Sequence, residues 1–240
     1  MDKGKVAFLL PLRSFLFLII YVDISIILGK GLDEITSAWT VIAVVVNIIT
    51  VALLVFYALK EGKTYKELIN YEKGKTKISQ IIVMCIIILF VGMGCMYLTA
   101  FILYGTIMPP VSVMLAAPLS KPLAVLVFLL LPVTTALAED GLYLGVGVNG
   151  ISNKTAAILV PAFFFALQHS FIPTLFDMRY VLYRFFSFLP LTIILCWHYY
   201  KKRNPLPIMI GHALIDLATV VLVLSTSMVP GLYESMLEQL

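Results

Sequence analysis

Charged residues are scarce in this sequence. Of its 240 residues, 12% are Asp, Glu, Lys or Arg and 61% are hydrophobic. A soluble domain usually has about a quarter charged and about half apolar residues. The composition therefore excludes an ordinary soluble domain. The net charge of +4 does not indicate a nucleic-acid partner, because the basic residues lie between hydrophobic runs, where membrane topology explains them.

The sequence also has few cysteines, no signal-peptide cleavage site and no evident internal repeat. The chain has only three cysteines, each inside an apolar run, so we expect neither a disulfide framework nor a cysteine metal site. The first apolar run, 6–29, lacks a small-residue cleavage site and carries Arg13 and Asp23, so we expect a retained helix and not a signal peptide. No internal repeat is evident, which argues against a small transporter built from inverted repeats.

Long hydrophobic runs dominate the chain, and several exceed the roughly 18 residues that a membrane-spanning helix needs. They predict an all-α, polytopic membrane bundle of about seven to eight helices that forms one domain over 1–240, with N-terminal spans in 1–119 and a motif-bearing core in 120–227. The expected spans are 6–29, 36–59, 79–105, 122–144, 155–172, 180–200 and 205–227. The proline-rich segment 108–122 is either an interfacial or re-entrant piece or part of an eighth span.

Basic residues between the spans predict the orientation. The segment 60–77 carries six lysines, 201–203 reads KKR, and Lys3 and Lys5 mark the amino end. Short cytoplasmic loops are enriched in Lys and Arg. We therefore expect a multi-pass protein of a bacterial or archaeal plasma membrane with its amino terminus in the cytoplasm.

Ionisable residues within spans are costly and usually face the bundle interior or a wet cavity. For the N-terminal ones we expect structural roles. Arg13 is close enough to the inner surface to extend its side chain towards it. Asn47 is expected to form a hydrogen bond between helices.

A second group comprises residue types that catalyse proton transfer or bind metals: Glu139, His169, His212 and Asp216. His212 and Asp216 are four residues apart, hence on one helix face about 6 Å from each other. On an α-helix Glu139 and Asp140 would point about 100° apart and could not serve one point equally. Counted along their spans, Glu139 and His212 lie towards the inner side and His169 towards the outer side. Tilt, a helix break at Gly141 or Gly145, or an extended fourth helix would bring them together; otherwise the span boundaries differ from those expected.

Three short motifs carry a resemblance. EDGLYLG (139–145), FALQH (165–169) and HALID (212–216) occur in that order. They resemble the CPBP family of intramembrane proteases, whose pattern is EExxxR, FxxxH and HxxxN or HxxxD. The family includes CAAX prenyl endopeptidases and bacterial bacteriocin-processing or immunity proteins. The resemblance covers roughly 120–227.

The resemblance implies a glutamate-dependent endopeptidase that cleaves a membrane-associated, hydrophobic or lipidated peptide within the bilayer. Glu139 would be the base that activates water. His169, in the motif begun by Phe165, would position that water, and His212 would polarise the scissile carbonyl. Asp216 would orient His212, because an ionised carboxylate cannot donate a hydrogen bond to an oxyanion.

The sequence departs from the family pattern at two positions. Asp140 replaces the second glutamate, and Leu144 stands where the pattern has arginine. The acidic pair therefore lacks its motif cation, for which Arg184 or Arg179 in the sixth span is a candidate substitute.

Two alternatives stay open. Glu139, His169 and His212 could instead be zinc ligands, although the HExxH signature is missing and no cofactor is expected. The loss of the arginine also fits a catalytically weakened member that acts as a membrane immunity or regulatory partner.

Overall fold

The computed structural model describes residues 6, 8–107 and 115–238, and this part of the chain is built from helices without any strand. The all-α bundle predicted from the sequence is confirmed. The long helices are α2 (Leu12–Leu28), α4 (Trp39–Lys60), α6 (Ile78–Tyr104), α8 (Lys121–Thr135), the π-helix η2 (Ala136–Val148), α9 (Lys154–His169), α10 (Met178–Lys202) and α11 (Leu206–Met228). The short helices are α3 (Leu32–Ile35), η1 (Thr36–Ala38), α5 (Tyr65–Leu68) and α12 (Leu232–Leu237).

Each of the seven expected spans overlaps a long helix, and the span 122–144 overlaps both α8 and η2. Five helical segments of the described chain are long and apolar enough to cross a membrane: 32–60, 78–104, 121–148, 178–202 and 206–228. The protein is therefore an integral membrane protein. Helices α2 and α9 are shorter, at 17 and 16 residues. Of the predicted interfacial segment or eighth span, 108–114 lies outside the described residues, and 115–120 has no regular structure.

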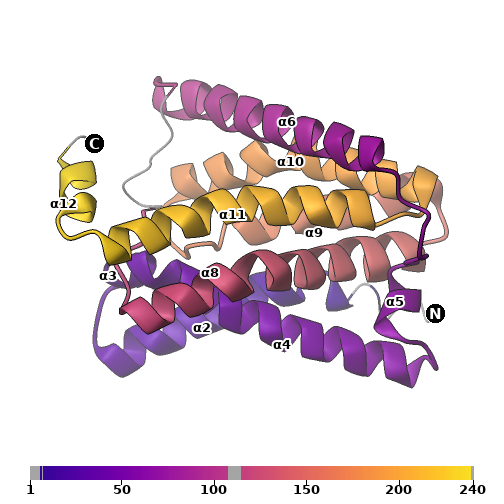
Figure 1. The fold of residues 1–240 in the computed structure, drawn as a ribbon, viewed down its shortest axis with the longest axis horizontal. Helices are drawn as coiled ribbons and strands as arrows, with labels where there is room; N and C mark the ends of the chain where they lie inside the picture. The colour runs from indigo at the N-terminus through magenta and orange to yellow at the C-terminus, as the bar shows by residue number, and fades with distance from the viewer. Residues whose placement is uncertain (1–5, 7, 108–114, 239–240) are drawn as a thin grey trace.

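The long helices run side by side (Figure 1). Helices α2 and α4 form one edge of the bundle and α6 forms the opposite edge, where it packs on α10 and α11. Helix α8 and its continuation η2 lie between these edges, in contact with α4, α9 and α11. The two glycines that the motif places near its carboxylates, at 141 and 145, do not break this segment. It continues to Val148 as a π-helix.

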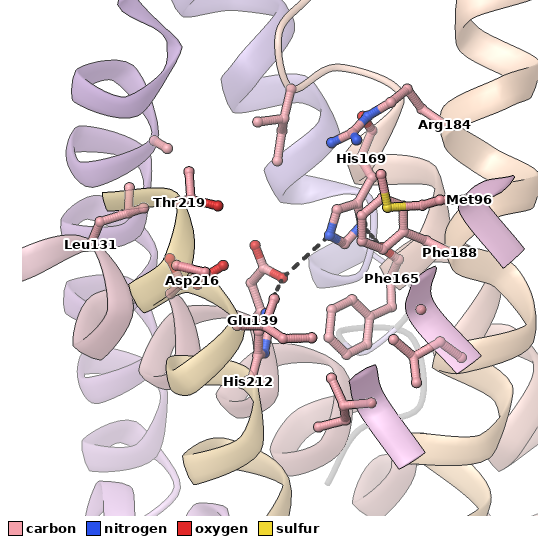
Figure 2. Close-up of a pocket in the computed structure, with 18 of the residues that line it drawn as sticks. Met96, Leu131, Glu139, Phe165, His169, Arg184, Phe188, His212, Asp216 and Thr219 are labelled. Atoms are coloured by element: carbon pink, nitrogen blue, oxygen red, sulfur yellow. Dashed lines mark hydrogen bonds and ion pairs between the residues drawn. The ribbon is translucent and has the colours of Figure 1, made fainter. Parts of the chain in front are cut away.

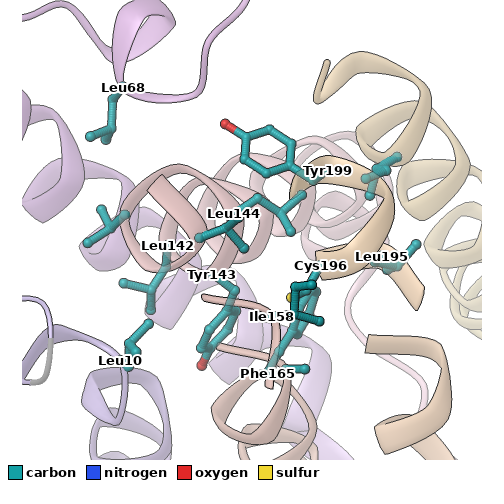
Figure 3. Packing of buried hydrophobic residues seen from close by; sticks show 14 of the residues in the cluster. Leu10, Leu68, Leu142, Tyr143, Leu144, Ile158, Phe165, Leu195, Cys196 and Tyr199 are labelled. Atoms are coloured by element: carbon teal, nitrogen blue, oxygen red, sulfur yellow. The ribbon is translucent and has the colours of Figure 1, made fainter. Parts of the chain in front are cut away.

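The π-helix is the most enclosed part of the molecule. All of its residues except Leu137 are buried. Apolar side chains from several helices surround it, and Leu142, Tyr143 and Leu144 lie at the centre of that cluster (Figure 3). In a π-helix each amide bonds the carbonyl five residues earlier, so the turn is wider than in an α-helix. Such segments are frequent at functional sites.

The loop after α4 holds both ends of η2. At its start the hydroxyl of Tyr65 donates to the carbonyl of Leu137 at 2.5 Å. Just past its end the side-chain amide of Asn149 donates to the carbonyl of Leu68 at 2.9 Å. A two-way side-chain cap between Thr64 and Glu67 starts helix α5, which carries these contacts. Loop and π-helix therefore form one unit.

Gly147 allows η2 to contact α9 closely. A Cβ atom built at this position would lie 2.9 Å from the Cβ and Cγ atoms of Pro161 and 3.0 Å from a methyl group of Leu10. A proline ring cannot rotate away, so a side chain here would force the two helices apart. Gly94 in α6 has nothing within 4 Å of the same construction.

We predict that Gly147→Ala lowers the free energy of unfolding by about 1–3 kcal/mol, the usual cost of overfilling a packed interior. Thermal unfolding of the purified protein in detergent measures this change. Gly94→Ala is the matched control and should leave the midpoint unchanged or raise it, because alanine favours a helix over glycine. Equal midpoints for the two variants would contradict the close packing at Gly147.

Candidate active site

The three motifs meet at one point in the bundle interior. Glu139 projects from η2, His169 from the last turn of α9 and His212 from the second turn of α11. The Oε2 atom of Glu139 lies 3.6 Å from Nε2 of His212 and 3.9 Å from Nε2 of His169 (Figure 2). Counting along the spans left an extended fourth helix as one way for these residues to meet, and the structure shows that extension. The segment continues past 144 to Val148, so Glu139 lies well inside it and not near its end.

The imidazole of His169 is fixed in orientation. Its Nδ1 lies 2.8 Å from the carbonyl oxygen of Phe165, one turn earlier. A carbonyl oxygen only accepts, so Nδ1 carries the proton, and Nε2 of the neutral ring is left as an acceptor towards Glu139. The ring also stacks on Phe188, with 3.6 Å between centroids. Phe165 lies between the two imidazoles, 6.0 Å from each centroid.

His212 faces a carboxylate on each of its ring nitrogens. Its Nε2 faces Glu139, and its Nδ1 lies 3.5 Å from Oδ2 of Asp140. The two neighbouring carboxylates thus serve one ring from different sides. This agrees with the expectation that the two carboxylates do not serve the same point equally, because each faces a different nitrogen.

Asp216 does not provide the carboxylate nearest to His212. The sequence assigned the orienting role to Asp216 because it shares a helix face with His212 and because an ionised carboxylate cannot donate to an oxyanion. In the structure Asp216 lines the cavity beside Glu139 (Figure 2). Its Oδ2 atom and both carboxylate oxygens of Asp140 are buried without a hydrogen bond, and Asp140 is the ion-pair partner at Nδ1. Spacing along a helix shows which residues share a face, but not which neighbour a ring nitrogen meets.

Arg13 does not take the surface position expected from the sequence. It is 1% exposed and does not extend to a membrane surface. Its Nη2 donates to Oε1 of Glu139 at 2.9 Å and to Oδ1 of Asn47 at 2.8 Å. Its Nε donates to Oε1 of Gln168 at 2.5 Å and its Nη1 to the hydroxyl of Thr50 at 3.2 Å. The cation beside Glu139 therefore comes from the first long helix.

The two cations considered from α10 lie elsewhere. Arg184 donates from Nε to the carbonyl oxygen of His169 at 3.1 Å and lies over the ring of Phe188. Arg179 is exposed, over the ring of Tyr104. Arg184 thus supports the backbone of the second motif and lines the same cavity, whereas Arg13 forms the ion pair with Glu139.

Asn47 forms hydrogen bonds between helices, as expected. It accepts from Arg13, and its amide donates to the hydroxyls of Thr135 at 2.8 Å and Thr134 at 3.3 Å. Gln168 accepts from Arg13 and, at 3.2 Å, from the hydroxyl of Tyr143. Charge balance could have revealed Arg13 in the sequence, because an arginine inside one span and an acidic pair without its motif cation in another are natural partners.

A cavity of about 460 Å³ opens next to these residues. Glu139, His169, His212 and Asp216 contribute to its wall, together with Arg13 and Arg184. The rest of the wall is mainly apolar and comes from α2, α4, α6, α8, α9, α10 and α11. A charged cluster at the side of an apolar cavity can bind a hydrophobic ligand and present polar groups to one part of it.

The zinc alternative gains no support from the geometry. Within the described ranges, no group of three or more His, Cys, Asp or Glu side chains is arranged to hold a metal ion. One oxygen of Glu139 is bound to Arg13, and Nδ1 of His212 faces Asp140.

Comparison with known proteins agrees with the motifs. No curated protein and no solved structure gave a significant match. Residues 121–218, which contain all three motifs, match the Rce1-like family, described as type II CAAX prenyl endopeptidase, and this match confirms the resemblance to the CPBP intramembrane proteases in that part of the chain.

Proposed function

We propose that this protein is a glutamate-dependent intramembrane endopeptidase. The observation that carries the proposal is the convergence of Glu139, His169 and His212 beside the cavity. The Oε2 atom of Glu139 lies 3.6 Å from Nε2 of His212 and 3.9 Å from Nε2 of His169. The family match over 121–218 supports a protease of the CAAX type. The charged groups lie in a low-dielectric interior, where electrostatic stabilisation of a transition state is strongest.

Glu139 is the proposed general base. A water molecule that donates one proton to Oε2 of Glu139 can donate the other to Nε2 of His169, which is an acceptor because Nδ1 donates to Phe165. The oxygen of this water attacks the peptide carbonyl carbon while its proton passes to Glu139. The protonated Glu139 then gives that proton to the leaving amine as the carbon–nitrogen bond breaks.

His212 is the proposed partner of the carbonyl oxygen. With Asp140 at Nδ1 and Glu139 near Nε2, both ring nitrogens face acceptors, and both are donors in the doubly protonated ring. From Nε2 the ring can donate to the oxygen that becomes negative in the tetrahedral intermediate. Asp140 takes the orienting role that the sequence gave to Asp216, and Phe165 and Arg184 support the second motif.

The proposed substrate is a membrane-associated peptide that is hydrophobic or lipidated. The apolar wall of the cavity favours such a group, and its charged side places the catalytic cluster next to it. The lipid bilayer is the other partner, and we propose no nucleic acid and no metal cofactor. A bacterial or archaeal plasma membrane, with the amino end in the cytoplasm, remains our proposal. The contact of the lysine-rich loop with the second basic segment, where Lys75 donates to the carbonyl of Arg203, supports placing these two segments on one side of the membrane.

A second candidate function is that of a membrane immunity or regulatory partner. Leu144, at the position of the motif arginine, is fully buried among apolar side chains. In that case, variants of Glu139, His169 and His212 would all keep the biological effect of the protein.

We predict that Glu139→Gln abolishes cleavage, because an amide cannot accept the proton of the attacking water. The assay uses a fluorogenic peptide with a prenylated cysteine followed by three residues, cleaved by protein reconstituted in liposomes. His169→Ala and His212→Ala should also lose activity, and thermal unfolding confirms that the variants fold. Undiminished turnover by folded Glu139→Gln would refute the mechanism.

A matched pair of variants tests which carboxylate orients His212. We predict that Asp140→Asn lowers kcat by up to about 10⁴-fold, the loss seen when an amide replaces the carboxylate that orients a catalytic imidazole. Asp216→Asn should lower kcat less, since Asp140 faces Nδ1 of the ring. A larger effect of Asp216→Asn would restore the assignment made from the sequence.

Metal removal distinguishes the proposed mechanism from the zinc alternative. Turnover of the prenylated peptide should be unchanged after dialysis against a strong chelator, because the proposed proton transfers involve side chains alone. Elemental analysis of the purified protein gives an independent readout. Loss of activity on chelation, with recovery on addition of zinc, would favour the alternative.

A further inference from the structure

We infer that Arg13 is a positioning residue of the proposed active site. It supplies the cation that the family motif places at position 144. The inference rests on the proposed function of Glu139. Arg13 lies in α2, outside the family match over 121–218, and nothing in the three motifs points to it. Its assignment comes from contacts alone.

Glu139 is a buried carboxylate that needs a compensating positive charge. This residue is 2% exposed, and a carboxylate buried among helices needs a compensating charge. The ion pair between Nη2 of Arg13 and Oε1 of Glu139, at 2.9 Å, supplies it. Position 144 cannot, because Leu144 packs in the apolar cluster with Leu68 and Tyr199 (Figure 3).

The contact with Arg13 also sets the direction in which the carboxylate of Glu139 points. Arg13 binds only Oε1, so the carboxylate plane is fixed and Oε2 faces the two imidazoles. Asn47 accepts from the same Nη2 atom and holds the guanidinium from the side of α4. A carboxylate without this contact could rotate about its last side-chain bond and turn Oε2 away from the histidines.

Arg13 also forms a hydrogen bond to the second motif. Its Nε donates to Oε1 of Gln168, the residue before His169, at 2.5 Å. One side chain thus contacts residues of α4, η2 and α9 from its own position in α2. The planar fork of arginine suits several acceptors at once, and a lysine would supply the charge but not this set of directions. Arg13 therefore fixes the relative position of the proposed base and the helix end that carries His169.

The experiment measures kcat and KM of Arg13→Gln and Arg13→Lys with the prenylated fluorogenic peptide in liposomes. We expect Arg13→Gln to lower kcat by about 100-fold, the loss typical of a misplaced catalytic group, with KM nearly unchanged. Arg13→Lys should recover part of this loss because it restores the charge. Arg179→Gln, at an exposed arginine of α10, is the matched control and should behave as the wild type.

A purely structural role would give a different result. Arg13→Gln would then reduce the amount of folded protein, but the folded fraction would turn over at the wild-type kcat, and that outcome would overturn the inference. Inactive Glu139→Gln together with fully active Arg13→Gln would overturn this inference and leave the proposed function standing. Active Glu139→Gln would defeat the proposed function itself.

If Arg13→Gln folds but is too unstable for kinetic measurements, the double variant Arg13→Gln/Glu139→Gln decides. It leaves two neutral amides in place of the ion pair, so no uncompensated charge remains buried. We expect its midpoint of thermal unfolding to exceed that of Arg13→Gln alone. A double variant that is as unstable as Arg13→Gln would show that Arg13 acts independently of Glu139 and would refute the inference.

Discussion

A buried charge in a membrane bundle needs a partner, and the ion pair of Arg13 with Glu139 meets that requirement here. Both side chains are nearly inaccessible, and removing one partner of such a pair costs several kcal/mol because the other stays charged and unpaired. The remaining donors of Arg13 are used by Asn47, Thr50 and Gln168. The position of α2 in the bundle is therefore tied to the position of the candidate base, and fold and site cannot be separated at this point.

The second constraint is the π-helix. It carries both carboxylates of the first motif, and they face His212 from different sides, one at each ring nitrogen. A π-helix is rare, and here enclosure and bonds at both ends hold it. Tyr65 binds the carbonyl of Leu137 near the start and Asn149 binds that of Leu68 beyond the end. The lysine-rich loop thus helps to hold the π-helix that carries the site. From the sequence, its charges predicted only the orientation of the protein in the membrane.

The sequence predicted the bundle well because long apolar runs leave few alternatives to spanning helices. It also predicted that Glu139, His169 and His212 converge, from the order of the motifs. It failed where the outcome depends on rotation and depth. Counting along the spans placed His169 away from Glu139 unless the fourth helix extends past its expected end. The shared helix face of Asp216 could not show that Asp140 lies at Nδ1 of His212. The spacing of residues in the motifs predicts neither the π-helix nor the rotation of α11 about its axis.

Arg13 changes how the substitution at Leu144 should be weighed. A motif records the chain positions from which a family supplies its charges, but the chemistry requires only that a cation be close to the carboxylate. Coulomb energy depends on the distance and on the surrounding medium, not on sequence separation. In this chain 126 positions separate Arg13 from Glu139, and their facing atoms are 2.9 Å apart. The absence of a motif residue is therefore weak evidence for lost chemistry until the surroundings of its partner are known, and here those surroundings contain a replacement.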